Sequence, residues 1–169
     1  YFRLHDAGRR SLGTFSRYRA VGKQVDVRDE TQVVHGVAAV VEAFGGIDVL
    51  ISNAGAFGPT KSALDFSLAE WEEVLRVNLT SQFLVCREVL PHMKMAGYGR
   101  VVCMASVVGR DAANPFAPAY SAAKAGIIRL VQALGRDLAK TGVLVNCVAP
   151  SAIKTAFFDT VPPEQVAAM

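Results

Sequence analysis

Several things that this sequence lacks limit what it can encode. It has only three cysteines, Cys86, Cys103 and Cys147, an odd number set far apart in apolar runs. This spacing is typical of reduced, buried thiols in a cytosol-like compartment, not of a disulfide framework or a metal site. No apolar run reaches the length of a membrane span, and no signal peptide is apparent. We therefore expect a cytoplasmic protein with no metal and no membrane partner.

The chain also has only a small excess of basic over acidic residues. The chain carries 18 basic and 15 acidic residues, a net charge of +3, and the basic residues are scattered. Nucleic-acid binding needs a concentrated basic patch, so we expect no nucleic-acid partner. Hydrophobic residues are abundant, at 51% against 20% charged residues in a chain of 169. This balance is typical of one globular domain with a substantial core.

Apolar runs and helical patterns alternate along the chain. A short β-like run, KQVDV, lies at 23–27. Near-continuous apolar runs predict strands at 47–55, where the strand breaks into a small-residue turn, at 100–106 and at 143–148. The intervening segments have helical periodicity and recognisable ends: Asp29 or Thr31 as a cap, Ser67 with Glu70 as a capping box, and glycine stops. Strands that alternate with helices predict a parallel sheet covered on both faces, with ligands beyond its carboxyl ends.

One stretch carries a recognisable chemistry. Ser106 closes a predicted strand, and Tyr120 and Lys124 are four residues apart on the following helix, so they share a face about one turn apart. A fixed ammonium favours the phenolate form of a nearby tyrosine, and a serine hydroxyl can bind a carbonyl oxygen. The three residues suit proton transfer in alcohol and carbonyl chemistry. By itself, however, a tyrosine and a lysine at this spacing are also common on exposed helices.

Other segments, in a fixed order, narrow the interpretation. They are SNAG at 52–55, RVNLT with Asn78, Ser106, the Tyr120–Lys124 pair, and VNCVAPSAIKT at 145–155. Together they resemble the short-chain dehydrogenase/reductase family, from about Gly22 to the end of the chain.

The resemblance implies the fold and its extent. It implies an α/β Rossmann-type domain with a doubly wound parallel sheet over residues 22–169, truncated at both ends. The family's first βαβ unit, with its glycine-rich TGxxxGxG turn, has no counterpart here, and neither has its last strand. Residues 1–21 have no clear period and contain five arginines, so we expect an irregular N-terminal arm.

The resemblance also implies four catalytic roles. Ser106 binds the substrate oxygen and Tyr120 gives or takes its proton. Lys124 lowers the pKa of the tyrosine and holds a ribose hydroxyl of the nicotinamide cofactor. Asn78 holds, through its backbone carbonyl at a helix kink, a water that links the lysine to solvent. Taken without the other motifs, Asn78 is equally an interior or capping asparagine.

The cofactor, NAD or NADP, is assigned to matching positions. Asp26 would meet the adenine amino group, although a strand-end aspartate also satisfies backbone donors. The adenosine side would be lined by small residues in the turn that ends the predicted strand at 47–55: Asn53, Ala54 and Gly55. The nicotinamide end would be contacted by Pro150 and Thr155, which follow the last predicted strand. Tyr120 and Lys124 are cofactor contacts as well. Ser52 and Ser151 depart from the family pattern, which has asparagine and glycine there.

The function implied is hydride transfer between NAD(P)H and a carbonyl or secondary alcohol, most similar to 3-oxoacyl-carrier-protein reductases. Three alternatives stay open: a sugar or polyol dehydrogenase, a nucleotide-binding domain with other chemistry, and an inactive fragment or interaction partner. The expected partners are a small-molecule substrate and further copies of the chain. The family associates as dimers or tetramers through helices near 80–95 and 120–140.

Overall fold

A computed structural model describes residues 22–111, 113–151 and 153 of the chain, and the structural statements below concern these residues. The expectations for the arm at 1–21 and for Thr155 lie outside the described residues.

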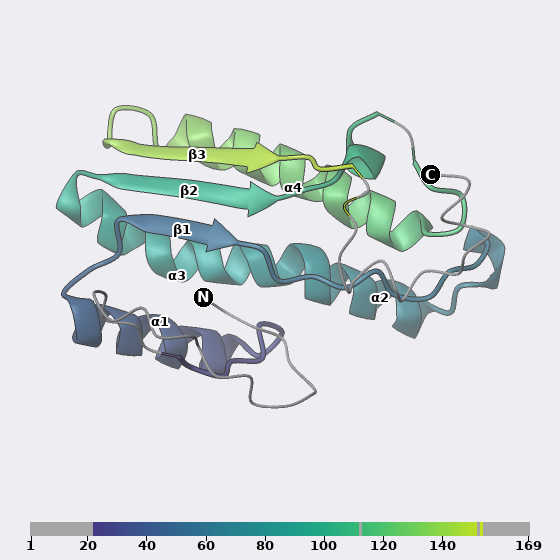
Figure 1. Cartoon of the computed structure of the whole chain (residues 1–169), viewed down its shortest axis with the longest axis horizontal. Helices are drawn as coiled ribbons and strands as arrows, with labels where there is room; N and C mark the ends of the chain where they lie inside the picture. Colours follow the sequence, from purple (N-terminus) through teal and green to yellow (C-terminus); the bar gives the residue numbers. More distant parts are fainter. Residues whose placement is uncertain (1–21, 112, 152, 154–169) are drawn as a thin grey trace.

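Three parallel strands form the sheet: β1 (Val49–Ser52), β2 (Gly99–Met104) and β3 (Val143–Val148), in the order β1-β2-β3. In Figure 1 the three arrows lie side by side and point the same way. The register aligns Ser52 with Cys103 and Cys103 with Cys147, so these three residues form one row across the sheet. The carboxyl ends of the strands therefore share one edge, as the sequence predicts.

The helices are α1 (Glu30–Phe44), α2 (Leu68–Leu75), α3 (Ser81–Ala96) and α4 (Pro118–Asp137). The predicted caps are confirmed: the Asp29 side chain accepts from the Gln32 N–H, and Ser67 and Glu70 form a reciprocal capping box. Short 3₁₀ turns, η1 (Ala63–Asp65) and η3 (Val107–Gly109), stand in the loops. A π-helical turn, η2 (Arg76–Thr80), joins α2 to α3.

The core lies between the sheet and two of these helices. Figure 1 shows α3 and α4 along the same face of the sheet, with α1 beside α3. Alternate strand residues point into this layer and are buried, among them Leu50, Val101, Cys103 and Val145. Because each strand side chain on this face meets a helix, burial fixes the register of the sheet. The predicted α/β class is confirmed.

The opposite face of the sheet is open in the described part of the chain. Its apolar side chains keep about half of their surface accessible: Val49 56%, Ile51 56%, Leu144 55% and Val148 45%. The sequence predicts helices on both faces, whereas the described helices cover one.

The β-like run at 23–27 is a correction. The structure places this segment in no strand, although Val25 and Val27 are buried. A strand needs a ladder partner, and the Asp26 N–H donates instead to the Gln32 side chain (3.0 Å) at the start of α1. The segment packs through its valines without joining the sheet.

The three cysteines are free thiols. Cys86 and Cys103 are buried as predicted, while Cys147 is only partly buried. Among the described helices, none has both the length and the apolar character needed to cross a bilayer.

Candidate active site

Ser106 and Tyr120 meet at the carboxyl edge of the sheet. Ser106 follows β2 in extended backbone (φ −163°, ψ 156°), and the N–H of the next residue donates to the Pro150 carbonyl (3.1 Å) beyond β3. Tyr120 lies in the first turn of α4, whose first residue is a proline, a residue pre-shaped for that position. The Ser106 side chain approaches the Tyr120 phenol and acts to lower the pKa of that phenol. The structure thus brings together the two groups on which the predicted chemistry depends.

Gly109 explains why the serine reaches the helix. A Cβ added to Gly109 would lie 2.5 Å from the backbone nitrogen of Ala125 and 2.5 Å from the backbone carbon of Lys124. Real Cβ atoms do not approach backbone so closely, so the turn η3 can press against α4 only with glycine here. This close contact sets the distance between the end of β2 and the face of α4 that carries Tyr120.

Lys124 points from α4 back toward the sheet. It is buried, and its ammonium donates to the Met104 carbonyl at the end of β2 (2.7 Å). The same ammonium lies 5.3 Å from the centre of the Tyr120 ring. The lysine is therefore held under the tyrosine by the last residue of the central strand.

Asn78 fastens the loop that leaves β1. Its side chain is fully buried and donates to the carbonyls of Ala56 (2.7 Å) and Val74 (3.0 Å), while its oxygen accepts from the Ala56 N–H (3.2 Å). Asn78 stands in the π-helical turn η2, the kind of local widening that is frequent at functional sites. The predicted helix kink is present, and the side chain, which the sequence did not assign, ties the kink to the loop.

Gly55 lies between Asn78 and Lys124. A Cβ at Gly55 would be 2.7 Å from the Asn78 side-chain oxygen and 3.6 Å from the Lys124 ammonium. Only a residue without a side chain leaves these two groups in place. Five of the predicted residues therefore converge at one edge of the sheet: Gly55, Asn78, Ser106, Tyr120 and Lys124.

The charges at this centre are set mainly by burial. Burial raises the pKa of the Tyr120 phenol, and the Ser106 side chain partly opposes this rise. Burial lowers the pKa of Lys124 to about 8. The expected lowering of the tyrosine pKa by the lysine is not visible in this structure, in which the ammonium donates to the Met104 carbonyl. That role of Lys124 stays a prediction.

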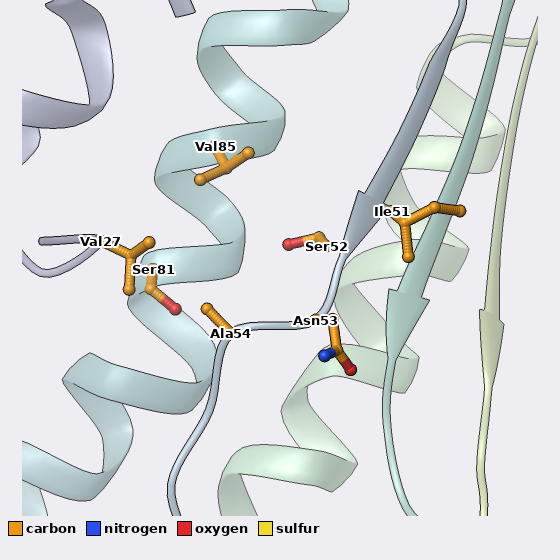
Figure 2. Close-up of a pocket in the computed structure, with 7 residues that line it drawn as sticks. All are labelled: Val27, Ile51, Ser52, Asn53, Ala54, Ser81 and Val85. Atoms are coloured by element: carbon orange, nitrogen blue, oxygen red, sulfur yellow. The ribbon is translucent and has the colours of Figure 1, made fainter. Parts of the chain in front are cut away.

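A small recess that is partly open to solvent lies beside the centre. Figure 2 shows the loop after β1 facing Ser81 and Val85 of α3, with Val27 alongside. Asn53 and Ala54 line it together with Ser52, while their role on the adenosine side of a cofactor stays a prediction. Ser81, Val85 and Val27 were not predicted, although Ser81 and Val85 are four residues apart and so share a helix face.

Asp26 is beside this recess, next to Val27 in the chain, but its carboxylate is engaged elsewhere. It pairs with the Arg28 guanidinium (2.6 Å) and accepts from the Arg28 N–H (3.0 Å), and these bonds hold its pKa below the usual value. Arg28 also pairs with Glu73 of α2 (2.6 Å). The structure shows Asp26 accepting from a backbone N–H, which is one of its two predicted roles. Its other predicted role, the contact with adenine, stays a proposal.

Three other residues complete the description. Pro150 meets the centre through its carbonyl, while Thr155 lies outside the described residues. Phe57 was not predicted, and its ring packs against that of Tyr120 with centres 4.8 Å apart.

Among the described residues, no group of three or more His, Cys, Asp or Glu side chains is arranged to hold a metal ion.

Comparisons with known proteins agree with this geometry. The profile of the family described as short chain dehydrogenase matches residues 7–166. The chain is similar to a 2-dehydro-3-deoxy-L-rhamnonate dehydrogenase (NAD(+)) of Sphingomonas sp. strain SKA58, with 39% identity over 142 residues, covering 84% of this chain and 57% of the relative. It is 41% identical to a putative ketoacyl reductase of Streptomyces coelicolor, over 80% of this chain and 52% of that protein.

The fold agrees as well. The crystal structure of levodione reductase superposes with a TM-score of 0.83 at 35% identity, covering 86% of this chain and 56% of that one. The chain spans about half the length of the curated relatives it matches.

Proposed function

The chain belongs to the short-chain dehydrogenase family, and from this premise we propose that the protein is an oxidoreductase that interconverts a carbonyl and a secondary alcohol with NAD or NADP. The observation that carries the proposal is the meeting of Ser106 and Tyr120 at the edge of the sheet, with the buried Lys124 ammonium 5.3 Å from the centre of the tyrosine ring. When bound, the nicotinamide cofactor supplies or accepts the hydride.

The recess beside the centre is suited to the adenosine part of such a cofactor. Its walls are small or apolar side chains, so a flat base can lie close to the backbone at Asn53 and Ala54. Asp26 is near enough in the chain to meet the base edge if its carboxylate shares its acceptor capacity with Arg28. Gly55 places no side chain beside the Lys124 ammonium, which we propose as the partner of a ribose hydroxyl. Pro150 and Thr155 belong to the nicotinamide end of this proposal.

The chain's own residues handle the proton. In the reductive direction the Ser106 hydroxyl donates to the substrate oxygen, and the Tyr120 phenol gives that oxygen its proton. A phenol whose pKa is raised by burial keeps its proton at neutral pH, so it is ready as the acid. Oxidation needs the phenolate, which Lys124 favours once its ammonium turns from Met104 toward the tyrosine.

Asn78 has two parts in this scheme. Its side chain holds the loop that carries Gly55, and so it fixes the position of the adenosine recess relative to Lys124. Its backbone carbonyl, in the widened turn, is the proposed holder of a water that returns the proton from solvent to the lysine.

The substrate class that we propose first is a 3-oxoacyl thioester, in line with the ketoacyl reductase among the relatives. A sugar-derived or polyol substrate is the second candidate, and the similarity to a dehydrogenase acting on a deoxy sugar acid favours it. Arg110 and Asn114, in the loop before Tyr120, are the candidates that we propose for a polar contact to either substrate.

The test is a spectrophotometric assay of the protein with NADH and with NADPH, using acetoacetyl thioesters and sugar-acid ketones. We expect one pair of cofactor and substrate to turn over. The substitution Tyr120→Phe should lower kcat by about 10²- to 10⁴-fold, the usual worth of a general acid. Tyr98→Phe is the matched control, because Tyr98 lies on the surface, stacked against Arg100.

Calorimetry with NADH and NADPH separates the remaining candidates. Binding of either cofactor without turnover of any carbonyl would favour a nucleotide-binding domain with other chemistry. No binding and no turnover would contradict the proposal and favour an inactive interaction partner.

We also propose that the protein associates as a homodimer or homotetramer through α3 and α4. On α3, Phe83 and Met95 leave 42% and 84% of their surface exposed, which suits burial against a second copy. Sedimentation velocity tests this: Met95→Lys should shift the protein toward the monomer, whereas Leu64→Lys, at an equally exposed site outside both helices, should not.

A further inference from the structure

Two buried thiols lie together directly beneath the candidate centre. Cys86 comes from α3 and Cys103 from β2, and both are almost completely buried, with 1% and 0% of their surface exposed. Their sulfur atoms are 3.9 Å apart, close to van der Waals contact. The proton-transfer scheme uses neither thiol.

The surroundings of Cys103 favour its reactive form. The two sulfurs are hydrogen-bonded, and either can be the donor; this bond and the nearby Lys124 charge act to lower the pKa of the Cys103 thiol, against the opposing effect of burial. The thiolate is the form that reacts with peroxides. Cys103 therefore has the character of the attacking sulfur, and Cys86 stands where a resolving thiol is needed.

A small oxidant has a route to this pair. In the sheet register Cys103 is the neighbour of Ser52, and the Ser52 side chain lies on the wall of the recess, as Figure 2 shows. Val85, beside Cys86 in α3, lines the same recess. Each thiol therefore neighbours a residue that lines the recess, which is partly open to solvent.

We propose that Cys86 and Cys103 form a peroxide oxidation site, in which a disulfide joins α3 to β2 beneath the candidate centre. The Cys103 thiolate attacks hydrogen peroxide, which gives a sulfenic acid and hydroxide that takes up a proton as water. The Cys86 thiol then displaces the second oxygen as water. In total, two thiols and one peroxide give one disulfide and two waters.

The bond has a direct connection to the centre. Cys103 immediately precedes Met104, whose carbonyl accepts from the Lys124 ammonium. The sulfur atoms must close from 3.9 Å to about 2.05 Å, which moves β2 or α3 at this point. Met104 and the lysine that it holds move with this stretch of backbone.

Cys147 provides the internal control. It is next to Cys103 in the register but on β3, it is less buried, and burial and the charge of Cys103 both raise the pKa of its thiol. Mere exposure to oxidant would modify Cys147 first, whereas the proposed chemistry selects the two more deeply buried sulfurs.

The experiment treats the folded protein with limited hydrogen peroxide, blocks free thiols with N-ethylmaleimide under denaturing conditions, and maps peptides by mass spectrometry. We expect the number of free thiols to fall from three to one, with a cross-linked peptide pair containing Cys86 and Cys103, and dithiothreitol to restore all three. Cys147→Ala should form the same cross-link at an unchanged rate. Cys86→Ala and Cys103→Ala should form none.

Because the main readout uses the unaltered chain, it does not depend on whether the variants fold. A cross-link that includes Cys147, a sulfinic acid on Cys103 without any cross-link, or three blocked thiols after treatment would each overturn the proposal.

Discussion

At the scale of single residues, the candidate centre depends on how little room is left between its side chains. Gly55 is the tightest case, because the space that a side chain would need is taken by Asn78 and Lys124. The sequence predicts Gly55 as part of a cofactor loop, but it does not reveal which groups meet there. That information lies in the packing of three distant segments.

We predict that Gly55→Ala destabilises the protein by about 1–3 kcal/mol, the usual cost of overpacking, and lowers turnover. The added methyl group must displace the Asn78 amide or the Lys124 ammonium. Urea unfolding and the spectrophotometric assay measure the two effects. Gly46→Ala is the control, since a Cβ there would meet no atom within 4 Å, and equal losses in both variants would contradict the explanation.

Lys124 gives stability a dependence on pH. Burial lowers its pKa to about 8, from 10.5 for an unperturbed lysine. The folded chain therefore releases this proton as the pH rises through about 8, while the unfolded chain holds it to about 10.5. In that window the unfolded state binds more protons, so stability rises with pH, by about 3 kcal/mol in all. Below pH 8 the cost of burying the charge is present in full.

Urea unfolding from neutral pH to about 10.5 checks this expectation. Other groups titrate in the same range, so the quantity to follow is the difference between the wild-type protein and Lys124→Met. As the pH rises, the free energy of unfolding of the wild-type protein should increase relative to that of Lys124→Met. If the unfolding free energies of the two proteins change with pH in the same way, burial does not lower the pKa of Lys124 as proposed.

At the scale of elements, local chemistry in the sequence predicts the boundaries well. Asp29 starts α1, and the capping box at Ser67 starts α2, because each satisfies backbone donors within its own turn. The prediction of a β-like segment at 23–27 is wrong for the opposite reason. A strand depends on a partner elsewhere, and a run of five residues carries no information about that partner.

The contact between η3 and α4 is the element-scale feature that positions Ser106. We predict that Gly109→Ala pushes η3 away from α4, because the new Cβ would meet the backbone rather than a flexible side chain. Turnover should fall while cofactor affinity stays near the wild-type value, since the recess is formed by other segments. Steady-state kinetics with calorimetry measures this split. Equal loss of both properties would indicate general unfolding instead.

At the scale of the whole molecule, the described elements are held by one core rather than by charge. Val33 of α1 is fully buried within this core. By contrast, the Arg87–Glu30 ion pair that links α3 to α1 is short (2.7 Å) but largely exposed, at 39% and 62%. Exposed pairs contribute little, because solvent screens them and ordering two long side chains costs entropy.

We therefore predict that Val33→Ala costs about 2 kcal/mol and that Arg87→Gln leaves the free energy of unfolding almost unchanged. Denaturant unfolding at low and at moderate salt measures both, and only the small effect of Arg87→Gln should depend on salt. A larger loss in the arginine variant would show that the helix is held by its charges.

The family and its α/β architecture are predictable from the sequence, because the strand runs and the ordered motifs each act locally. The convergence of Gly55, Asn78 and Lys124, the recess wall supplied by α3 and the opposition of Cys86 to Cys103 are not. Each of these joins segments at least 17 residues apart in the chain. Such a contact is specified by the assembled core and by no pattern within one segment.

The order of the strands has a consequence for how the backbone exchanges hydrogen with deuterated water. Among the described strands β2 alone has a neighbour on each side. Its amide protons are bonded in both directions, whereas β1 and β3 each turn alternate N–H groups away from the ladder. In solution the central strand should thus keep its protons longest, and the outward amides of the flanking strands should lose theirs early.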